Sequence, residues 1–572
     1  MKRKVRIIIP LLVLAVVCVV GVLSLCKDKT VTVYYTNDIH SYIDNHLKSE
    51  NGLTYSMVAA LKANTKNSLL VDAGDHIQGT AYGGMDNGAT IIKLMNAAGY
   101  DVATLGNHEF DYGMAGCMAT VDAAEFLYVS CNFRHEADGV KGETVLESYV
   151  IKKVGGVKIA FVGITTPETI SSSTPAYFQD ESGNYIYGID GGEDGGDLYA
   201  SVQRAIDSAK ADGADYVIAL GHLGVDLSSG PWTSRNVIAN TQGLDAFIDG
   251  HSHTTIPMEQ VSDKKGKTVL LTQTGSYLNA VGKLVISDDG EITTQLLTGE
   301  DIPPVDSVRK IEDDWINSIN DRLGQVIGSA EVTLDNFDSD GKRLVRKQGT
   351  NSGDFAADAL YYLFDDMGMD VDIAVMNGGG IRNTAITGQL TYLSCKEIHT
   401  FGNVACLLKV TGQQILDALE WGSKGVSDLA EDGSLLHVAG VTYTLDLGYE
   451  STVQADDKDV WTGGPTGEYR VKDVMIYNKQ TGEYEPLDLT AEYNMAGYNY
   501  TLRDLGGGFA MLNGATNVLD YVMEDYMVLA NYIMGFENGV VGAENSPLAA
   551  KYEGMLMDYS SVNGSGRINV VD

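Results

Sequence analysis

GNHEFD, residues 106–111, follows the apolar run YDVATL, residues 100–105. A short apolar run that stops at polar residues indicates a buried strand whose carboxyl end lies at that point. Neither a hairpin turn nor a helix cap requires an amide, an imidazole and a carboxylate side by side. The stretch therefore indicates a β-strand that presents ligand or catalytic side chains at its end.

The same arrangement recurs between residues 30 and 301. Apolar, β-branched runs end abruptly in polar residues in TVTVYYTNDIH, SLLVDAGDHIQG, VKIAFVGITTPE, ADYVIALGHLG, LDAFIDGHSHT and TVLLTQTGSY. Helix-like segments such as TYSMVAALKANT and DLYASVQRAIDSAKADG separate several of these runs. This alternation predicts an α/β sandwich with largely buried sheets, in which ligands gather at the carboxyl ends of the strands.

The chain of 572 residues is long enough for at least two domains. Pro303 and Pro304 begin a segment with helical periodicity, and beyond it helix-like and strand-like segments are mixed. We predict a membrane anchor or signal at residues 1–29, an α/β domain at 30–304 and a linker helix at 305–328. A smaller α+β domain is expected at residues 329–572.

The N-terminus predicts association with a membrane. A basic start, MKRKVR, precedes an apolar run of about 19 residues, IIIPLLVLAVVCVVGVLSL, which is long enough to span a bilayer as a helix. Positive charge before the span predicts that the rest of the chain lies outside the cytoplasm, anchored in the cell membrane or secreted. Three interpretations stay open: an uncleaved anchor, a lipoprotein modified at Cys26, which follows Leu25 instead of a small residue, or a cleaved signal.

The composition limits the class of partner. The formal net charge is −37 and the isoelectric point is about 4.5. This balance argues against nucleic acid, because the phosphate backbone attracts Lys and Arg. It does not exclude small phosphorylated substrates, which need only a few local cations or metal ions.

Four cysteines lie in the body of the chain, at positions 117, 131, 395 and 406, without metal-binding spacing. The sequence leaves open whether they form two disulfides or remain free buried thiols.

The strand ends of the first domain carry the side chains that bind borderline divalent metals, which accept imidazole nitrogen and carboxylate or amide oxygen. The candidate ligands are Asp38, His40, Asp75, Asn107, His222, His251 and His253. Two neighbouring cations need a shared carboxylate, and Asp75, which is preceded by a glycine, suits that role. His108 with Asp111 three residues on predicts a catalytic pair that steadies phosphoryl oxygens or protonates a leaving oxygen.

The motifs TNDIH, DAGDHIQG, GNHEFDYG, GHLG and GHSHT together resemble the calcineurin-like metallophosphatases. The second domain narrows the resemblance to the 5′-nucleotidase family, which includes UDP-sugar hydrolases and 2′,3′-cyclic phosphodiesterases. The resemblance implies a four-layer α/β/β/α sandwich joined by a helix to the α+β domain, and two divalent metal ions such as Zn or Mn. It also implies that Asp38, His40, Asp75 and His253 surround one metal, and Asp75, Asn107, His222 and His251 the other.

In such a protein the second domain binds the nucleotide. The motif NGGGIR implies Asn377 and Arg382 as substrate contacts, FGN implies Phe401 and Asn403, and an upstream arginine falls at Arg343 or Arg346. Tyr498 or Tyr500, of which we favour Tyr500, would supply a second aromatic face.

One motif departs from the family. Where family sequences commonly read GGDGF, this chain has GGGF with Gly507 in place of the aspartate that is implied to contact the sugar. Asp504, three residues earlier, is the candidate substitute. We therefore expect weak discrimination between ribose and deoxyribose.

The sequence predicts a metal-dependent hydrolase that releases phosphate from nucleotides outside the cytoplasm. A nucleotide-sugar hydrolase or a 2′,3′-cyclic-nucleotide phosphodiesterase is the alternative within enzymes. A surface protein that binds without turnover is the alternative outside them.

Overall fold

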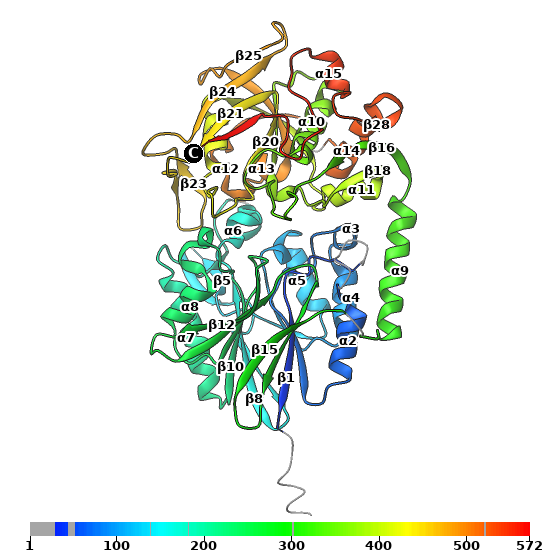
Figure 1. The fold of residues 1–572 in the computed structure, drawn as a ribbon. Coiled ribbons are helices and arrows are strands. Elements are labelled where there is room, and N and C mark those ends of the chain that lie inside the picture. Colours follow the sequence, from blue (N-terminus) through cyan, green and yellow to red (C-terminus); the bar gives the residue numbers. More distant parts are fainter. Residues whose placement is uncertain are drawn as a thin grey trace, which may run out of the picture.

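The computed structural model describes residues 29–43, 52–137, 139–180, 182–299, 302–519 and 522–571. Within these residues the N-terminal half contains two six-stranded sheets that pack face to face (Figure 1). One sheet has the order β15 (Ile292–Leu297), β14 (Val281–Ile286), β1 (Val31–Thr36), β2 (Ser68–Asp72), β3 (Val102–Thr104) and β4 (Leu127–Val129). The other has the order β12 (Thr255–Ser262), β13 (Thr268–Thr274), β11 (Ala246–Ile248), β10 (Tyr216–His222), β8 (Val157–Thr165) and β7 (Tyr149–Val154).

Strand β1 illustrates why both sheets are buried. Val33 and Tyr35 pack between the two sheets, whereas Tyr34 faces the helices on the outer side. This period of two follows from the pleat of a strand, and all three side chains are aliphatic or aromatic because both faces are covered. Strands β1, β2, β3 and β4 of the first sheet are parallel, as are β8, β10, β11 and β13 of the second.

Helices cover the outer faces of both sheets. Helices α2 (Tyr55–Ala63), α4 (Ala89–Ala98) and α5 (Gly113–Ala123) lie on one side, and α7 (Gly196–Ala211) and α8 (Ser234–Asn240) on the other (Figure 1). The predicted four-layer sandwich is therefore confirmed.

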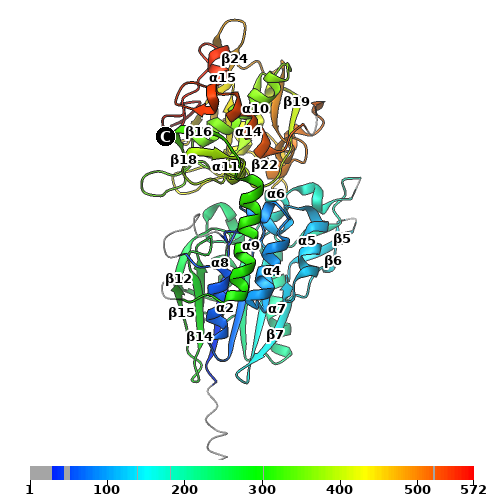
Figure 2. The ribbon, with the colours of Figure 1, turned by 90° about the vertical axis from the view of Figure 1, so that its right-hand side faces the viewer.

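Helix α9 (Asp306–Leu323) connects the two domains and runs along the first one beside α2 and α4 (Figure 2). The carboxylate of Glu312, which is buried, accepts hydrogen bonds from Ser56 N at 3.0 Å and Ser56 Oγ at 2.8 Å. Trp315 Nε1 donates to the carbonyl of Tyr82 at 2.8 Å. These bonds attach the connecting helix to the first domain.

The second domain mixes strands and helices, as predicted for an α+β domain. Among its described residues, a five-stranded sheet has the order β20 (Leu436–Ala439), β17 (Ile373–Asn377), β26 (Glu492–Tyr498), β19 (Ala405–Thr411) and β27 (Thr516–Leu519). Smaller sheets contain β16 (Val326–Leu334), β18 (Ile386–Thr391) and β28 (Val540–Val541), and β21 (Val441–Asp446), β24 (Val471–Asn478), β25 (Glu483–Pro486) and β29 (Ile568–Val571). The α-helices among its described residues are α10 (Asn351–Asp366), α11 (Tyr392–Ile398), α12 (Gly412–Gly422), α13 (Asn499–Leu502), α14 (Asp525–Gly535) and α15 (Pro547–Lys551).

Cys117, Cys131, Cys395 and Cys406 are buried free thiols, which decides between the two interpretations that the sequence left open. The predicted membrane span and Cys26 lie outside the described residues. In the part of the chain that the structure describes, we find no helix with the length and apolar character of a membrane span.

Candidate metal centre and substrate cavity

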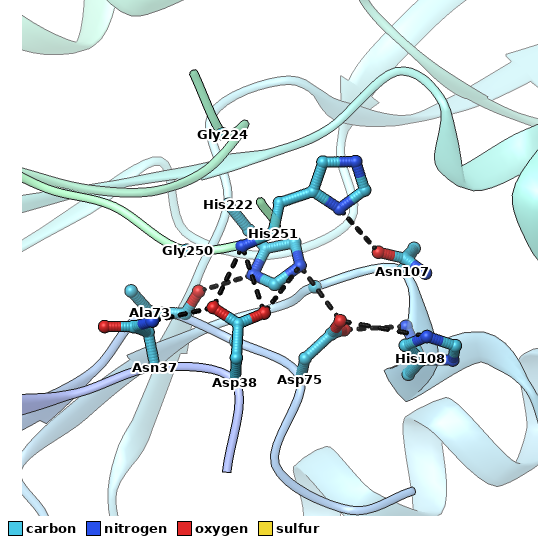
Figure 3. A network of polar contacts seen from close by, with 12 residues as sticks. Asn37, Asp38, Ala73, Asp75, Asn107, His108, His222, Gly224, Gly250 and His251 are labelled. Atoms are coloured by element: carbon cyan, nitrogen blue, oxygen red, sulfur yellow. Dashed lines mark hydrogen bonds and ion pairs between the residues drawn. The ribbon is translucent and has the colours of Figure 1, made fainter. Parts of the chain in front are cut away.

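Because their strands are parallel, the polar strand ends meet at one edge of the sandwich, the edge that faces the second domain. Asp38 follows β1, Asp75 follows β2 and Asn107 follows β3 from one sheet. His222 ends β10, and His251 follows β11 from the other sheet. Figure 3 shows these side chains gathered in one place, with Asp38 and Asp75 pointing toward His222 and with Asn107 beside His251.

The backbone at this edge is held in an uncommon conformation. Five of the seven predicted metal ligands have positive φ angles: Asp38 49°, His40 50°, Asp75 59°, His251 79° and His253 54°. Such angles are uncommon outside glycine and concentrate at functional sites, where the surrounding structure enforces them.

Glycine permits the close approach of two of the strand-end loops. Gly74 has φ of +93°, and a Cβ there would lie 2.6 Å from the backbone nitrogen of Gly106. A Cβ on Gly106 would lie 2.2 Å from Asp75 Oδ1. Neither position has room for a side chain.

The predicted ligands form two adjoining groups, Asp38 with His40 and His253, and Asp75 with His222 and His251, whose ligand atoms lie within 4.8 Å of one another in each group. His253 Nε2 is 2.9 Å from His40 Nε2, and His222 Nε2 is 3.1 Å from Asp75 Oδ2. Asp75 Oδ2 also lies 3.7 Å from His40 Nε2, so this carboxylate stands between the two groups.

Asn107 joins the second group, because its Oδ1 is 3.0 Å from His251 Nδ1. All seven predicted ligands are therefore together.

Three of the histidines have one ring nitrogen committed to an outer acceptor. His40 Nδ1 donates to the Gln78 carbonyl at 2.8 Å, and His222 Nδ1 donates to the Ala73 carbonyl at 2.7 Å. His251 Nε2 donates to Glu168 Oε2 at 2.5 Å. The remaining nitrogen of each ring faces the centre, where His222 Nε2 is buried 3.1 Å from Asp75 Oδ2. This is the arrangement of metal-ligating histidines, so the donor set fits a pair of divalent cations.

Burial and neighbouring charges set the ionisation of these groups. Burial lowers the pKa of His40 and of His253 well below the usual value, which favours the neutral imidazole that binds a metal. Burial opposes ionisation of Asp75, but His222 and His108 hold the pKa of this carboxyl well below its usual range.

His108 and Asp111 lie at the rim of the centre. His108 Nδ1 donates to Asp111 Oδ2 at 2.6 Å, and Arg382 Nη2 donates to His108 Nε2 at 3.0 Å. His108 also stands within ligand distance of His40 and Asp75. The geometry therefore brings the predicted pair together, and its catalytic role stays a prediction.

Two carboxylates of the site were not singled out from the sequence. Glu109 is fully buried and accepts hydrogen bonds from the backbone nitrogens of Asp75 at 2.9 Å and Gly106 at 2.7 Å, so it ties two strand-end loops together. Glu168 orients His251. Their positions in the sequence could have indicated them, since Glu109 lies inside GNHEFD and Glu168 ends VKIAFVGITTPE.

A cavity of about 790 Å³ extends from the metal centre into the second domain. All predicted substrate residues line it, namely Arg343, Arg346, Asn377, Arg382, Phe401, Asn403 and Tyr500. The structure therefore brings the motifs of the second domain to the metal centre of the first.

The structure distinguishes the two candidate arginines. Arg343 forms an ion pair with Glu431. The guanidinium of Arg346 forms neither a hydrogen bond nor an ion pair within the described part of the chain, and burial together with Arg343 and Arg382 lowers its pKa to about 9. Arg346 is thus the arginine that lacks an anionic partner.

The three candidate aromatic residues differ in whether they line the cavity or belong to the core. Phe401 lies 5.8 Å from the His108 ring and 5.2 Å from Arg382 Cζ. Tyr500 lines the cavity and donates its hydroxyl to the Ser172 carbonyl of the first domain at 2.8 Å. Tyr498 is buried and donates to the Asp525 carbonyl, so it belongs to the core.

Comparisons with known proteins agree with this geometry. Residues 326–514 match the family model described as 5′-nucleotidase, C-terminal domain, and residues 72–271 match that of bacterial capsule synthesis protein PGA_cap. Human 5′-nucleotidase is 25% identical over 550 residues, which cover 88% of each chain. The structure of a 5′-nucleotidase precursor from Thermus thermophilus is similar with a TM-score of 0.73 at 26% identity, over 95% of this chain and 99% of that one.

Trifunctional nucleotide phosphoesterase protein YfkN of Bacillus subtilis is 26% identical over 547 residues. The match covers 89% of this chain and 34% of YfkN, so the chain spans only part of the length of that relative.

Proposed function

The chain belongs to the 5′-nucleotidase family and is a metal-dependent phosphoester hydrolase, and on this basis we propose that it releases phosphate from nucleoside 5′-monophosphates. The reaction takes place in the cavity between the domains. The inward-facing nitrogens of His40, His222 and His251 carry the proposal, because each of these rings is fixed by an outer acceptor.

Seven residues would hold the cations: Asp38, His40, Asp75 and His253 for one, and Asp75, Asn107, His222 and His251 for the other. Two bound divalent cations would neutralise the phosphate charge and help to generate the nucleophile from water. The metals we expect are Zn, Mn or a similar ion.

The remaining residues act on the phosphate itself. Arg346 and Arg382 face the cavity without carboxylate partners among the residues described, so their guanidinium groups are available to bind phosphate oxygens. His108, held by Asp111 at 2.6 Å, protonates the leaving oxygen or steadies a phosphoryl oxygen.

The nucleoside lies on the side of the second domain. Phe401 and Tyr500 line the same cavity and present two aromatic faces for a planar base. Asn377 and Asn403 line the same region and supply amide groups that hydrogen-bond base edges.

A substrate panel tests this function. The purified protein is incubated with Mn²⁺ or Zn²⁺ and adenosine 5′-monophosphate, UDP-glucose, 2′,3′-cyclic AMP or p-nitrophenyl phosphate, and kcat/KM is measured for each. The proposal expects the highest value for the 5′-monophosphate. A higher value for the nucleotide sugar or the cyclic nucleotide would instead assign one of the two alternative hydrolase activities, and no turnover of any compound would support a binding protein.

The location outside the cytoplasm also remains a proposal. It rests on the basic start and the apolar run of the N-terminus. Protease added to intact cells would cleave the body of the protein if this topology is right, and would leave it intact if the body lies inside.

A further inference from the structure

Two hydroxyl groups in the wall of the cavity have no hydrogen-bond partner in the described part of the protein. They belong to Ser172, the last residue of α6 (Thr169–Ser172), and to Ser173. Both residues line the cavity, and Ser173 is only 1% exposed. Buried polar groups are rarely left unpaired, because the loss of hydration costs about 1–3 kcal/mol. Two adjacent unpaired hydroxyls therefore point to a ligand that pairs with them.

The residues around these serines indicate which part of a bound nucleotide the two hydroxyls would contact. Helix α6 packs against the turn η6 (Gly506–Gly508) of the second domain. Tyr500 donates its hydroxyl to the Ser172 carbonyl at 2.8 Å, and a Cβ on Gly506 would lie 2.3 Å from the Tyr500 ring. The serines, Tyr500 and the glycine turn thus form one continuous wall, next to the proposed binding site of the base.

Position 507, where the family motif has an aspartate, contributes no side chain to this wall. Gly507 has φ of +73°, and its carbonyl accepts a hydrogen bond from Trp421 Nε1 at 2.7 Å. Asp504, the candidate substitute, lines the cavity, and one of its two carboxylate oxygens is already engaged, because Oδ2 accepts a hydrogen bond from Asn499 Nδ2 at 2.7 Å. A Cβ at position 507 would lie 3.2 Å from Ser434 Oγ, and on the α6 side of the wall the hydroxyls of Ser172 and Ser173 are unpaired among the described residues.

We propose that Ser172 and Ser173 hydrogen-bond the sugar hydroxyls of the bound nucleotide, in place of an acidic side chain at position 507. The inference rests on the proposed function. A serine hydroxyl both donates and accepts, so two of them match a pair of sugar hydroxyls without a charge. The contact comes from the first domain, whereas the rest of the nucleoside site lies on the second. The inference replaces the sequence-based expectation of weak sugar discrimination.

The test compares KM for adenosine 5′-monophosphate with KM for its 2′,3′-dideoxy analogue. In the wild-type protein we expect a KM about 10-fold higher for the dideoxy nucleotide, because two hydrogen bonds of about 0.5–1.5 kcal/mol each are lost. Ser172→Ala and Ser173→Ala should each reduce this ratio, and the double variant should bring it close to one. Both KM values are measured on the same preparation of each variant. A smaller fraction of folded protein therefore does not change their ratio.

Ser171→Ala is the matched control. Ser171 lines the same cavity, but its hydroxyl already donates to the Glu168 carbonyl at 3.1 Å, so the variant should keep the wild-type ratio. A wild-type ratio near one, or a double variant that keeps the wild-type ratio, would overturn the inference while nucleotide hydrolysis stands. Hydrolysis of p-nitrophenyl phosphate without hydrolysis of any nucleotide would overturn the proposed function, and the inference with it.

Discussion

Single residues outside the candidate ligand set orient the side chains of the proposed metal centre. Glu168 accepts the outer proton of His251 at 2.5 Å and so fixes the ring with Nδ1 toward Asn107. Loss of such a partner typically weakens metal binding 10- to 100-fold. We expect this loss for Glu168→Ala, measured by titration of the metal-free protein with Zn²⁺.

Glu193→Ala provides the comparison, because Glu193 is exposed and lines the same cavity. An equal loss of affinity in both variants would mean that total charge, and not the bond to His251, determines binding.

His108 and His251 differ in the role that we assign to them. His108→Ala should keep its bound metal and lose about 10²–10⁴-fold in kcat, the range of general acid–base catalysis. His251→Ala should lose metal, because its ring belongs to the ligand group. Metal content measured by mass spectrometry separates the two cases, and equal metal loss would show that His108 is also a ligand.

The two arginines of the upstream site permit a direct comparison. Arg346→Ala should raise KM for a nucleoside monophosphate by about 10-fold or more, because hydrogen bonds to charged groups contribute about 1.5–3 kcal/mol. Arg343→Ala should have a smaller effect, since Arg343 already pairs with Glu431. If Arg343→Ala raises KM as much as Arg346→Ala, the substrate displaces Glu431.

The sequence indicated which candidate ligands gather at the centre, but it did not indicate the residues that support them. Asp38, Asp75, Asn107 and His222 were recognisable because each follows an apolar run directly. Glu168 lies 83 residues from the His251 that it orients, and no local sequence pattern predicts a contact between residues so far apart. The choice between Arg343 and Arg346 likewise depended on Glu431, which is 88 residues away from Arg343.

At the level of elements, the start of helix α14 supports the loop that carries Phe401. Asp525 is buried, and its Oδ2 accepts hydrogen bonds from the backbone nitrogens of Gly402 at 3.0 Å and Asn403 at 2.9 Å. Asp525→Ala leaves these two backbone nitrogens unpaired, so it should displace the loop and raise KM for a nucleotide. KM for p-nitrophenyl phosphate should rise less, because this substrate has no base to bind.

Glu524→Ala is the control, because Glu524 is the exposed neighbour of Asp525. A variant of Asp525 that loses activity on both substrates in equal measure would indicate general unfolding and not displacement of the loop.

The first domain was more predictable than the second. Strands such as β1, β2 and β10 are apolar runs with polar ends, because both sheet faces are buried and the carboxyl ends form the site. In the second domain, β17 pairs with β20 and β26, which come from far along the chain. Such pairing depends on packing between remote segments, so the sequence indicated an α+β domain without its strand order.

At the level of the whole molecule, the site is complete only when both domains meet. Arg382 of the second domain donates to His108 of the first at 3.0 Å, and Gln78 of the first donates to Thr400 of the second at 2.9 Å. The metal ligands come from one domain and the aromatic residues and arginines from the other. The proposed hydrolysis of a nucleotide therefore requires the assembled pair of domains.

Phosphate release from adenosine 5′-monophosphate by metal-depleted protein, before and after addition of Mn²⁺ or Zn²⁺, tests the central claim most directly. The two-cation centre predicts no release after chelation, recovery on addition of the metal, and no recovery in Asp75→Ala, which removes the carboxylate between the two ligand groups. Undiminished release in the presence of chelator, or full recovery in Asp75→Ala, would contradict it.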